Sequence, residues 1–467
     1  MTSILFHARA RRDIHFIDAI EKLKDKYEIV VVADDQSYSS YENIDGINLE
    51  RHNVTIQDLE KIPENDLERL PQIEALLGTN CFKFSENYLL YNKYVRRYAT
   101  EYAYAKNLRL IPQTVYSDFV FLERIIKKYN VEYAFFETLD LPFTMVLKGM
   151  AENGIIKQAF EGESLSLGDG MRFRIATGQH RRSKKIEYYF EKEKTKEAII
   201  WAQKLVADYC KEKKGNSYDD YFVNIANPYT RYSFHELIDK FKRVLKGESF
   251  YPALIHNFNR FRSLPYFSKS LPDTRIISYF LQLTPEATML SQVPEVSDQE
   301  YLIEQMAICG KHGYTVVVKE HPICFGNRPS SFYKELSYLP NVVLLPPAFP
   351  ARDVLLKSEA VVVASGTSLG HEAIIAGKPL ICLGDPYYNI CENNVKISHP
   401  KEVWDALDQI SITEKAQIKF LAAVYDATYE YPDFISFADQ DQNRNIGPVI
   451  AEALNDEIQM YEKGLLS

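Results

Sequence analysis

From about residue 272 onward, short apolar runs alternate with amphipathic stretches. The apolar runs are RIISYF, YTVVVKE, NVVLLP, AVVVAS, PLICLG and, with a weaker pattern, NVKIS. Between them, helices are predicted to begin near Ser297, Ser330, Ala351, Thr367 and Pro400. Uninterrupted apolar strands that alternate with helices are typical of a parallel sheet covered on both faces. The pattern therefore predicts an α/β unit in this half of the chain.

The first half shows the same alternation with less regularity. ILFHA and EIVVVADD flank the amphipathic stretch FIDAIEKLKDKY, which predicts a strand, a helix and a second strand. Later segments predict a helix through FVFLERIIKKYN, a strand over 131–137, a helix through FTMVLKGMAENG and a strand over 155–160. Residues 36–65 are polar and predict no clear element.

Two α/β halves are therefore expected, joined near residues 262–272 and enclosing a cleft. We predict an N-terminal acceptor-side domain over 1–265, which includes a charged helical insertion around 181–247. A second domain is predicted over 266–440, and a closing helix over 441–467. Ligands of such sheets bind beyond the carboxyl ends of the strands, so the cleft is the expected site.

Composition narrows the class of protein and its partners. The chain has 467 residues, 46% apolar and 25% charged, which is typical of a soluble globular protein. A net charge of −9 disfavours nucleic acid as a partner. The six cysteines form no C-x-x-C pair, and no stretch approaches the ~20 apolar residues of a membrane span, so we expect a cytoplasmic protein.

Peripheral contact with the inner face of the cell membrane is left open by the charged insertion. Arg181, Arg182, Lys184 and Lys185 would form a basic platform for anionic lipid or an anionic acceptor. The alternative is a solvated helical face with an apolar stripe.

A hydroxyl-rich turn follows the predicted strand 360–364. Ser365, Gly366, Thr367 and Ser368 fall where this strand ends and a helix begins. The first N–H groups of a helix and the positive end of its dipole favour a bound anion, and glycine lets the backbone approach. The turn predicts a phosphate site, although helix capping alone would also explain the hydroxyls.

Polar side chains also follow two neighbouring strands of the predicted sheet. A histidine at such an edge can donate a hydrogen bond to a phosphate oxygen, whereas a lone histidine is more often a packed core residue. One helical turn beyond Thr367, a carboxylate could reach a sugar hydroxyl. The remaining donor-site candidates are Gln282, Glu286, Thr288, Lys319, Glu320, His321, Pro322 and Glu372.

Five motifs occur in order over roughly residues 275–390: YFLQLTPEAT, SDQEYLIEQMA, VVVKEHP, PNVVLLPP and VVVASGTSLGHEAIIAGKPLICLGDPYY. Together they resemble the bacterial capsular and surface polysaccharide biosynthesis proteins, which include the Kdo transferases of capsule assembly. The resemblance implies a GT-B glycosyltransferase, with two Rossmann-like domains whose parallel sheets face a central cleft. It also implies a nucleotide-sugar donor, with CMP-sugars such as CMP-Kdo favoured, and no required cofactor or catalytic metal.

In relatives that use CMP-sugars, a His-Pro pair and a hydroxyl-rich helix start hold the nucleotide phosphate. His321-Pro322 and Ser365 to Ser368 match these positions, so His321 is expected to offset charge on the leaving nucleotide. The N-terminal half departs from the pattern. Relatives carry an EDG or EEG run that continues into basic residues, whereas this chain has AFEGESLSLGDG, with Glu161-Gly162 as the nearest counterpart.

Sugar transfer to a hydroxyl needs a carboxylate that acts as base or as nucleophile. Glu161 and Glu137 follow predicted strands and are the first candidates, with Asp140 and Asp169 behind them. Each of these residues could instead serve as a turn or cap.

The expected acceptor is an oligosaccharide or glycolipid. Arg9, Arg11 and Arg12 follow the first strand and, with Asp140, are candidates to bind it. They could equally be exposed charges near a helix start.

The predicted reaction moves a sugar to a hydroxyl of a growing capsular or surface polysaccharide. Alternatives on the same fold are a CMP-polyol phosphate transferase of teichoic acid type and a UDP-sugar epimerase. A non-catalytic carbohydrate-binding subunit of an export assembly is a further alternative. A dehydrogenase is disfavoured because no G-x-G-x-x-G follows the first strand, and no zinc spacing or P-loop occurs.

Overall fold

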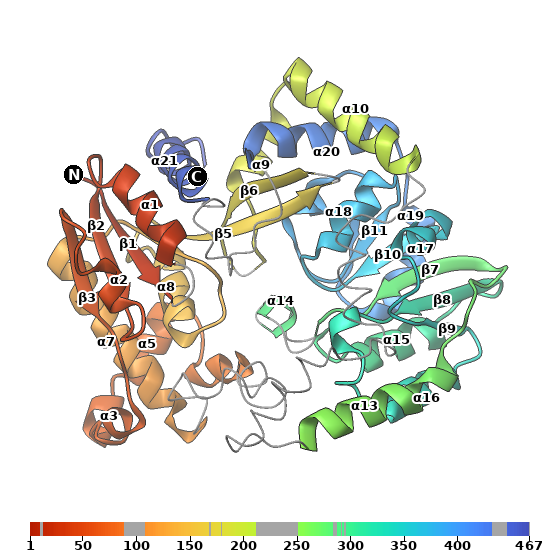
Figure 1. Ribbon diagram of the computed structural model, residues 1–467, viewed down its shortest axis with the longest axis horizontal. Coiled ribbons are helices and arrows are strands. Elements are labelled where there is room, and N and C mark those ends of the chain that lie inside the picture. Colours follow the sequence, from red (N-terminus) through yellow and green to blue (C-terminus); the bar gives the residue numbers. More distant parts are fainter. Residues whose placement is uncertain are drawn as a thin grey trace, which may run out of the picture.

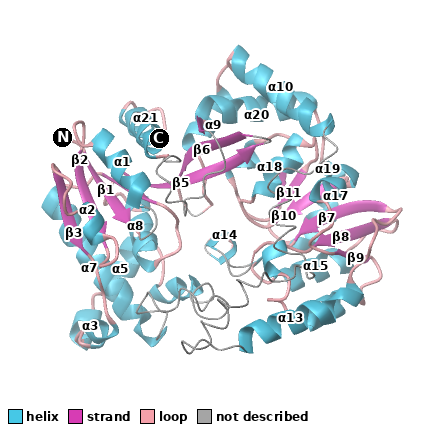
Figure 2. Cartoon of the chain, in the orientation of Figure 1, coloured by secondary structure: helices cyan, strands magenta, loops and turns pink. Residues whose placement is uncertain are grey.

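A computed structural model describes residues 1–9, 13–87, 108–167, 170–178, 180–211, 251–283, 287–290, 292–293, 296–431 and 446–466. Two separate groups of strands, each covered by helices, make up the chain (Figures 1 and 2). The predicted fold class, α/β with two Rossmann-like units, is confirmed.

The first sheet has seven strands in the order β13-β6-β5-β4-β1-β2-β3. The pairs among β1 to β5 are parallel, whereas β6 pairs antiparallel with both β5 and β13. The sheet is therefore mixed rather than purely parallel. Its strands are β1 (Ser3–Ala8), β2 (Glu28–Ala33), β3 (Ile47–Arg51), β4 (Tyr133–Phe136), β5 (Gln158–Leu167), β6 (Gly170–Ala176) and β13 (Tyr429–Tyr431).

Both faces of this sheet are buried, which explains why β1 is an uninterrupted apolar run. Ile4 and Phe6 point to one core, and Leu5, between them, points to the other. The helices on the first face are α1 (Asp13–Leu23) and α21 (Gly447–Glu462); those on the second are α5 (Leu70–Leu77), α7 (Ile111–Tyr129) and α8 (Pro142–Glu152). In Figure 1 the closing helix α21 lies beside α1, at the N-terminal unit.

Short elements fill residues 36–65, for which the sequence predicted none. Besides β3 they are α2 (Tyr38–Tyr41), α3 (Ile56–Glu60) and α4 (Glu64–Leu67). β3 is an edge strand that is only half-buried, so its sequence INLER carries too few apolar residues to stand out.

The second sheet has six parallel strands in the order β12-β11-β10-β7-β8-β9. All six match the apolar runs noted above. They are β7 (Arg275–Phe280), β8 (Tyr314–Lys319), β9 (Val342–Leu345), β10 (Ala360–Val363), β11 (Leu380–Cys382) and β12 (Val395–Lys396).

The helices of this unit begin at or near the predicted positions. Ser330 and Ala351 open α16 and α17, and Thr367 caps α18. The set is α13 (Tyr251–Ser263), α14 (Ala287–Leu290), α15 (Gln299–Ile308), α16 (Ser330–Ser337), α17 (Ala351–Lys357), α18 (Ser368–Ile375), α19 (Val403–Gln409) and α20 (Glu414–Ala427).

The β5–β6 hairpin joins the two units. Figure 1 shows both strands on the side of the first sheet that faces the second unit. Leu165 and Leu167 of β5 pack in one apolar cluster with Val361 and Val363 of β10. Arg182, just after the hairpin, places Nη1 2.8 Å from Oδ1 of Asp385, which follows β11. The hairpin therefore belongs to the first sheet by hydrogen bonding and to the second core by packing.

Three segments depart from the predicted domain boundaries. Helix α13, placed in the first domain by the boundary at 265, packs against α16 of the second unit. Residues 429–431, assigned to the second domain by the boundary at 440, form β13 of the first sheet. The predicted insertion 181–247 is described only as far as residue 211 and contains α9 (Lys184–Glu191) and α10 (Lys196–Lys211). Both helices pack their apolar residues against α20, which agrees with the interpretation of this part as a helical face with an apolar stripe.

Candidate functional site

Hydrogen bonds connect the loops that follow β7, β8 and β10 of the second sheet. Gln282, after β7, donates from Nε2 to Oγ of Ser365 at 2.7 Å. Arg328 donates from Nη2 to the Gln282 carbonyl at 2.8 Å and places Nη1 2.6 Å from Oε1 of Glu320. Three of the strand ends singled out in the sequence are thus held together at one edge of the sheet.

Glu320 points into the protein rather than toward a ligand. It accepts hydrogen bonds from the Tyr333 hydroxyl and from the His321 N–H, and its side chain is buried. Burial disfavours the charge of Arg328, but the Glu320 carboxylate and the neighbouring Tyr333 and Cys324 together hold the pKa of Arg328 above its ordinary value. Glu320 therefore fixes the loop that carries His321, which is a structural role the sequence did not predict.

His321 is a neutral hydrogen-bond donor in this setting. Its Nδ1 accepts from the Ile323 N–H at 3.2 Å, so the proton of the neutral ring lies on Nε2. Burial, together with the nearby charges of Arg328 and Lys319, lowers the pKa of His321 to about 4. Pro322 opens a short 3₁₀ turn, Pro322–Cys324, that holds the ring in place.

Lys319 is likewise turned inward. Its buried ammonium donates to the Pro347 carbonyl at 3.0 Å and braces the loop after β9. Glu372 lies on α18 and is partly exposed, and Thr288 is buried on α14. Glu286 lies outside the described residues.

The Ser-Gly-Thr-Ser turn already uses two of the amides that the sequence suggested were unpaired. The Gly366 N–H donates to Gln292 Oε1 at 3.3 Å, and the Thr367 N–H donates to the Tyr388 hydroxyl at 3.2 Å. The same hydroxyl donates to the Ser365 carbonyl at 2.9 Å. This corrects the expectation, because Tyr388 reaches the turn from the loop after β11, which no local pattern reveals.

Thr367 is the N-cap of α18, as the capping interpretation required. Its Oγ1 accepts from the Gly370 N–H at 3.4 Å. Ser368 begins the helix, so the positive end of the dipole lies at this edge of the sheet. Capping and anion binding are compatible here because the cap satisfies only one of the first amides.

Glu161 lies inside β5 and not at the end of a strand. The strand was predicted over 155–160, but its antiparallel partner β6 extends it to Leu167, and Glu161 pairs with Ala176. Its Oε1 is 2.6 Å from Nη2 of Arg181 and accepts the Leu139 N–H at 3.2 Å. Burial raises the pKa of Glu161, although Arg181 opposes this.

The other acidic and basic candidates fall near the ends of β1 and β4. Glu137 follows β4 directly and is partly exposed. Arg9 Nη1 contacts both carboxylate oxygens of Asp140, at 2.9 and 3.1 Å, so these two acceptor candidates bind each other. Arg11, Arg12 and Asp169 lie outside the described residues.

The predicted basic platform does not form. Arg181 and Arg182 pair with Glu161 and Asp385, and Lys185 is buried beside Tyr429. Lys184 is the more exposed member, 3.8 Å from Glu187. None of the described helices is long and apolar enough to cross a bilayer.

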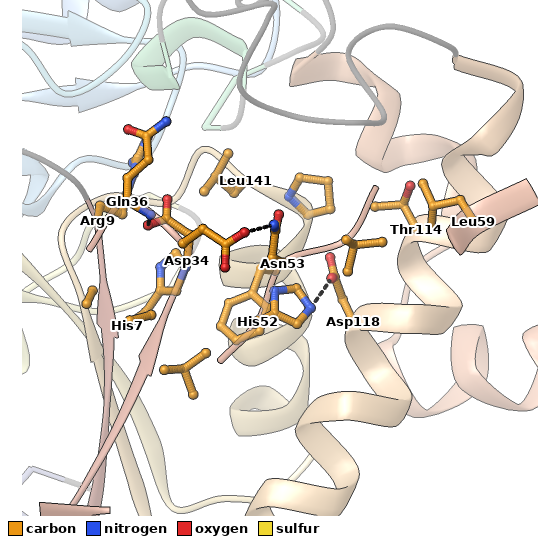
Figure 3. A pocket seen from close by; sticks show the side chains of 17 residues that line it. His7, Arg9, Asp34, Gln36, His52, Asn53, Leu59, Thr114, Asp118 and Leu141 are labelled. Carbon is orange, nitrogen blue, oxygen red and sulfur yellow. Dashed lines mark hydrogen bonds and ion pairs between the residues drawn. The ribbon is translucent and has the colours of Figure 1, made fainter. Parts of the chain in front are cut away.

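A polar cavity of about 230 Å³ lies at the carboxyl edge of the first sheet and was missed by the sequence interpretation (Figure 3). His7, Asp34 and His52 reach it from the ends of β1, β2 and β3, and Asp118 reaches it from α7. His52 Nε2 is 3.1 Å from Asp118 Oδ1. The sequence offered a local signal only for Asp34, which directly follows the apolar strand β2.

A second cavity, of about 270 Å³, lies beside Glu161 and is also lined by Lys148, Glu152 and Arg182. Within the described ranges, no group of three or more His, Cys, Asp or Glu side chains is arranged to hold a metal ion.

Comparisons with solved structures find distant similarity. The β-Kdo 2,7-transferase KpsC of Thermosulfurimonas dismutans is 15% identical, with 72% of this chain and 88% of that chain covered and a TM-score of 0.38. A glycosyltransferase of Rickettsia africae is 12% identical, with 98% of both chains covered and a TM-score of 0.29. MnaA of S. aureus, solved with UDP, is 12% identical, with 99% and 97% covered and a TM-score of 0.29.

No curated protein matches the chain. The family described as capsule polysaccharide biosynthesis protein matches residues 178–424, which is more than half of the sequence. This region contains both the His321-Pro322 pair and the Ser365 to Ser368 turn. The chain therefore belongs to the capsule polysaccharide biosynthesis protein family, a family of glycosyltransferases, as its sequence motifs predicted.

Proposed function

We propose that the protein transfers a sugar from a nucleotide-activated donor to a hydroxyl of a growing capsular or surface polysaccharide, with a CMP-sugar such as CMP-Kdo as the favoured donor. One observation carries the proposal. The loops after β7, β8 and β10 are tied together by hydrogen bonds, and they bring the His321-Pro322 pair and the start of α18 to the same edge of the sheet.

Donor binding at this edge follows from the chemistry of its groups. In its neutral form His321 offers Nε2–H, and the first turn of α18 offers N–H groups and the Ser368 hydroxyl. Negative charge grows on the nucleotide phosphate as the bond to the anomeric carbon breaks. Donors already held in place by Gln282 and Glu320 would stabilise this charge without reorganisation.

The transfer itself requires a proton acceptor or a nucleophile near the acceptor hydroxyl. In an inverting reaction, the acceptor oxygen bonds to the anomeric carbon, the bonding pair leaves with the phosphate oxygen, and a carboxylate takes the hydroxyl proton. We propose Glu161 or Glu137 for this step. Glu161 has a raised pKa and lines a cavity, while Glu137 lies at a strand end and is partly exposed.

A matched pair of histidine variants tests the donor site. His321 and His399 both precede a proline, and in both rings Nδ1 accepts the N–H two residues later at 3.2 Å. The two substitutions to alanine remove the same local hydrogen bond. We expect His321→Ala to lower CMP release from CMP-Kdo by about 100-fold or more, as for loss of a transition-state donor, and His399→Ala to leave it unchanged.

Equal activity of both variants would contradict the role of His321.

Thermal shifts with CMP, UDP, GDP and CDP identify the donor class, since a ligand that binds only the folded protein raises its stability. Turnover of CMP-glycerol in place of CMP-sugars would favour the polyol phosphate transferase. Absence of nucleotide release with any donor and acceptor would favour a binding subunit. Glu161→Gln and Glu137→Gln, assayed in parallel, separate the two carboxylates.

A further inference from the structure

The 230 Å³ cavity of the first unit has the size of a small ligand. Loops after β1, β2 and β3 form one side, and α7 with the start of α8 forms the other (Figure 3). Drug-sized ligands occupy pockets of roughly 300–1,000 Å³, so this cavity suits a smaller molecule such as a single sugar ring. It lies at the carboxyl edge of a largely parallel sheet, where ligands of α/β folds bind.

An unsatisfied buried nitrogen indicates that a ligand belongs here. His7 lines the cavity and is 8% exposed, and its Nδ1 has no hydrogen-bond partner among the residues that the structure describes. The ring is held by stacking on Phe143, with ring centres 4.6 Å apart. A buried polar atom without a partner is unfavourable, so a ligand hydroxyl or a water is expected to satisfy it.

A second polar group in the cavity is already oriented. His52 Nε2 lies 3.1 Å from Asp118 Oδ1, and Phe143 packs against the same ring, with centres 4.8 Å apart. Packing against Phe121 and Phe143 leaves the His52 ring little rotational freedom. Such preorganised groups lower the entropy cost of binding a small polar molecule.

The charges around the cavity disfavour an anionic ligand. Burial, and after it the neighbouring Arg9 and His52, holds the pKa of His7 far below its ordinary value, so this ring is neutral. Arg9 is the one Lys or Arg side chain among the lining residues, and Asp140 neutralises it from both carboxylate oxygens. The carboxylates of Asp34 and Asp118 line the same cavity.

We propose that this cavity binds one uncharged, hydroxyl-rich sugar unit of the acceptor. Carboxylates and a neutral imidazole accept hydrogen bonds from sugar hydroxyls, and the apolar lining of Leu141 and Phe143 suits the carbon face of the ring. The identification of the ligand as part of the acceptor rests on the proposed glycosyltransferase function. Arg9, a sequence candidate for acceptor binding, lines this cavity with its guanidinium paired to Asp140.

Saturation-transfer NMR on the full-length chain tests the proposal. The neutral probes are the methyl glycosides of glucose, galactose, mannose and N-acetylglucosamine, and the anionic probes are glucuronate and Kdo. We expect transfer to at least one neutral glycoside and none to the anions. Asp118→Asn should weaken binding about tenfold or more, as for the loss of a hydrogen bond to a charged group.

Two further variants complete the design. Asp408→Asn makes the same chemical change at an exposed ion pair of the second unit and should bind as the wild type does. Asn53→Trp, at an exposed position on the rim, should block the cavity without disturbing the core, so it decides the question if Asp118→Asn fails to fold.

Three results would overturn the assignment: binding of none of the neutral glycosides, preferential binding of an anionic one, or binding that survives Asn53→Trp. CMP thermal shifts on the same samples separate the two proposals. If CMP does not raise the melting temperature of the wild-type protein, this counts against the donor site alone, since the cavity lies in the other unit.

Discussion

Glu320 and His321 are adjacent, yet the fold gives them opposite tasks. Glu320 is enclosed by Arg328 and Tyr333, whereas His321 keeps a neutral ring whose Nε2 carries the proton. Burying a carboxylate is tolerable only because a full positive charge and two further donors surround it. The histidine loop is thus held by a buried carboxylate that has three hydrogen-bonding partners.

Glu320→Gln tests this anchor. The substitution leaves Arg328 buried without a counter-charge, so we expect a loss of about 3–5 kcal/mol in the free energy of unfolding, measured with urea. The matched control is Glu359→Gln, which breaks the exposed pair with Arg275 and should cost at most about 1 kcal/mol. A similar loss of unfolding free energy in both variants would show that the buried pair contributes no more to stability than the exposed pair does.

Two buried histidines predict a pH dependence of stability. Burial lowers the pKa of both His321 and His371 from 6.5 to about 4. Arg328 adds to this at His321, whereas at His371 the Glu163 carboxylate opposes it and Arg174 adds to it. The unfolded chain therefore binds more protons between these pH values. The contribution of these two neutral rings to the free energy of unfolding is fully present above pH 6.5 and is lost as the pH falls toward 4.

Between pH 7 and pH 5, each ring should account for about 2 kcal/mol of lost unfolding free energy. His371→Gln should reduce the loss by about that amount, as measured by urea unfolding at the two pH values. An unchanged pH dependence in the variant would contradict the neutral, buried state of His371.

Helix α18 depends on one close contact at its first turn. An added Cβ at Gly370 would clash with the Tyr388 ring, whose hydroxyl bridges the Ser365 carbonyl and the Thr367 N–H. The glycine is needed here for space and not for an unusual backbone angle. The aromatic ring, in turn, sets the shape of the turn that we propose for phosphate binding.

Gly370→Ala should therefore displace Tyr388 and cost about 1–3 kcal/mol in unfolding free energy, with a weaker CMP thermal shift. Gly170→Ala is the control, because among the residues that the structure describes an added Cβ there meets only the Leu167 carbonyl oxygen, at 3.9 Å. Normal CMP binding by Gly370→Ala would separate the turn from the donor site.

The β5–β6 hairpin makes the two units interdependent. Its strands hydrogen-bond within the first sheet, while Leu165 and Leu167 fill the core beneath β10 and α18. The chain then returns from α20 to the first sheet through β13, and α21 packs on α1. Because of these contacts, unfolding of one unit removes packing partners of the other.

We expect the whole chain to unfold in one cooperative transition, which circular dichroism and intrinsic fluorescence would both report. Leu165→Ala should cost about 2–5 kcal/mol, as for a buried leucine, and should shift both signals together. Leu356→Ala, at an exposed leucine, is the control and should change little. Separate transitions in the wild type would show that the hairpin does not couple the units.

The second sheet could be predicted almost strand by strand, because its strands are buried on both faces and appear as continuous apolar runs. The positions of His321 and the Ser365 turn at strand ends followed from the same local pattern. Most helix starts did too, since caps such as Thr367 are short-range features.

Partners distant in the chain were decided only by the tertiary structure. Pairing with β6 extends β5 past Glu161. The Tyr388 hydroxyl accepts the hydrogen bond of the Thr367 N–H, and Arg328 forms an ion pair with Glu320. The cavity of the first unit gathers His7, His52 and Asp118 from three separate elements. A hydrogen-bonding group is satisfied by whichever partner packing brings near, and spacing along the sequence carries no record of that choice.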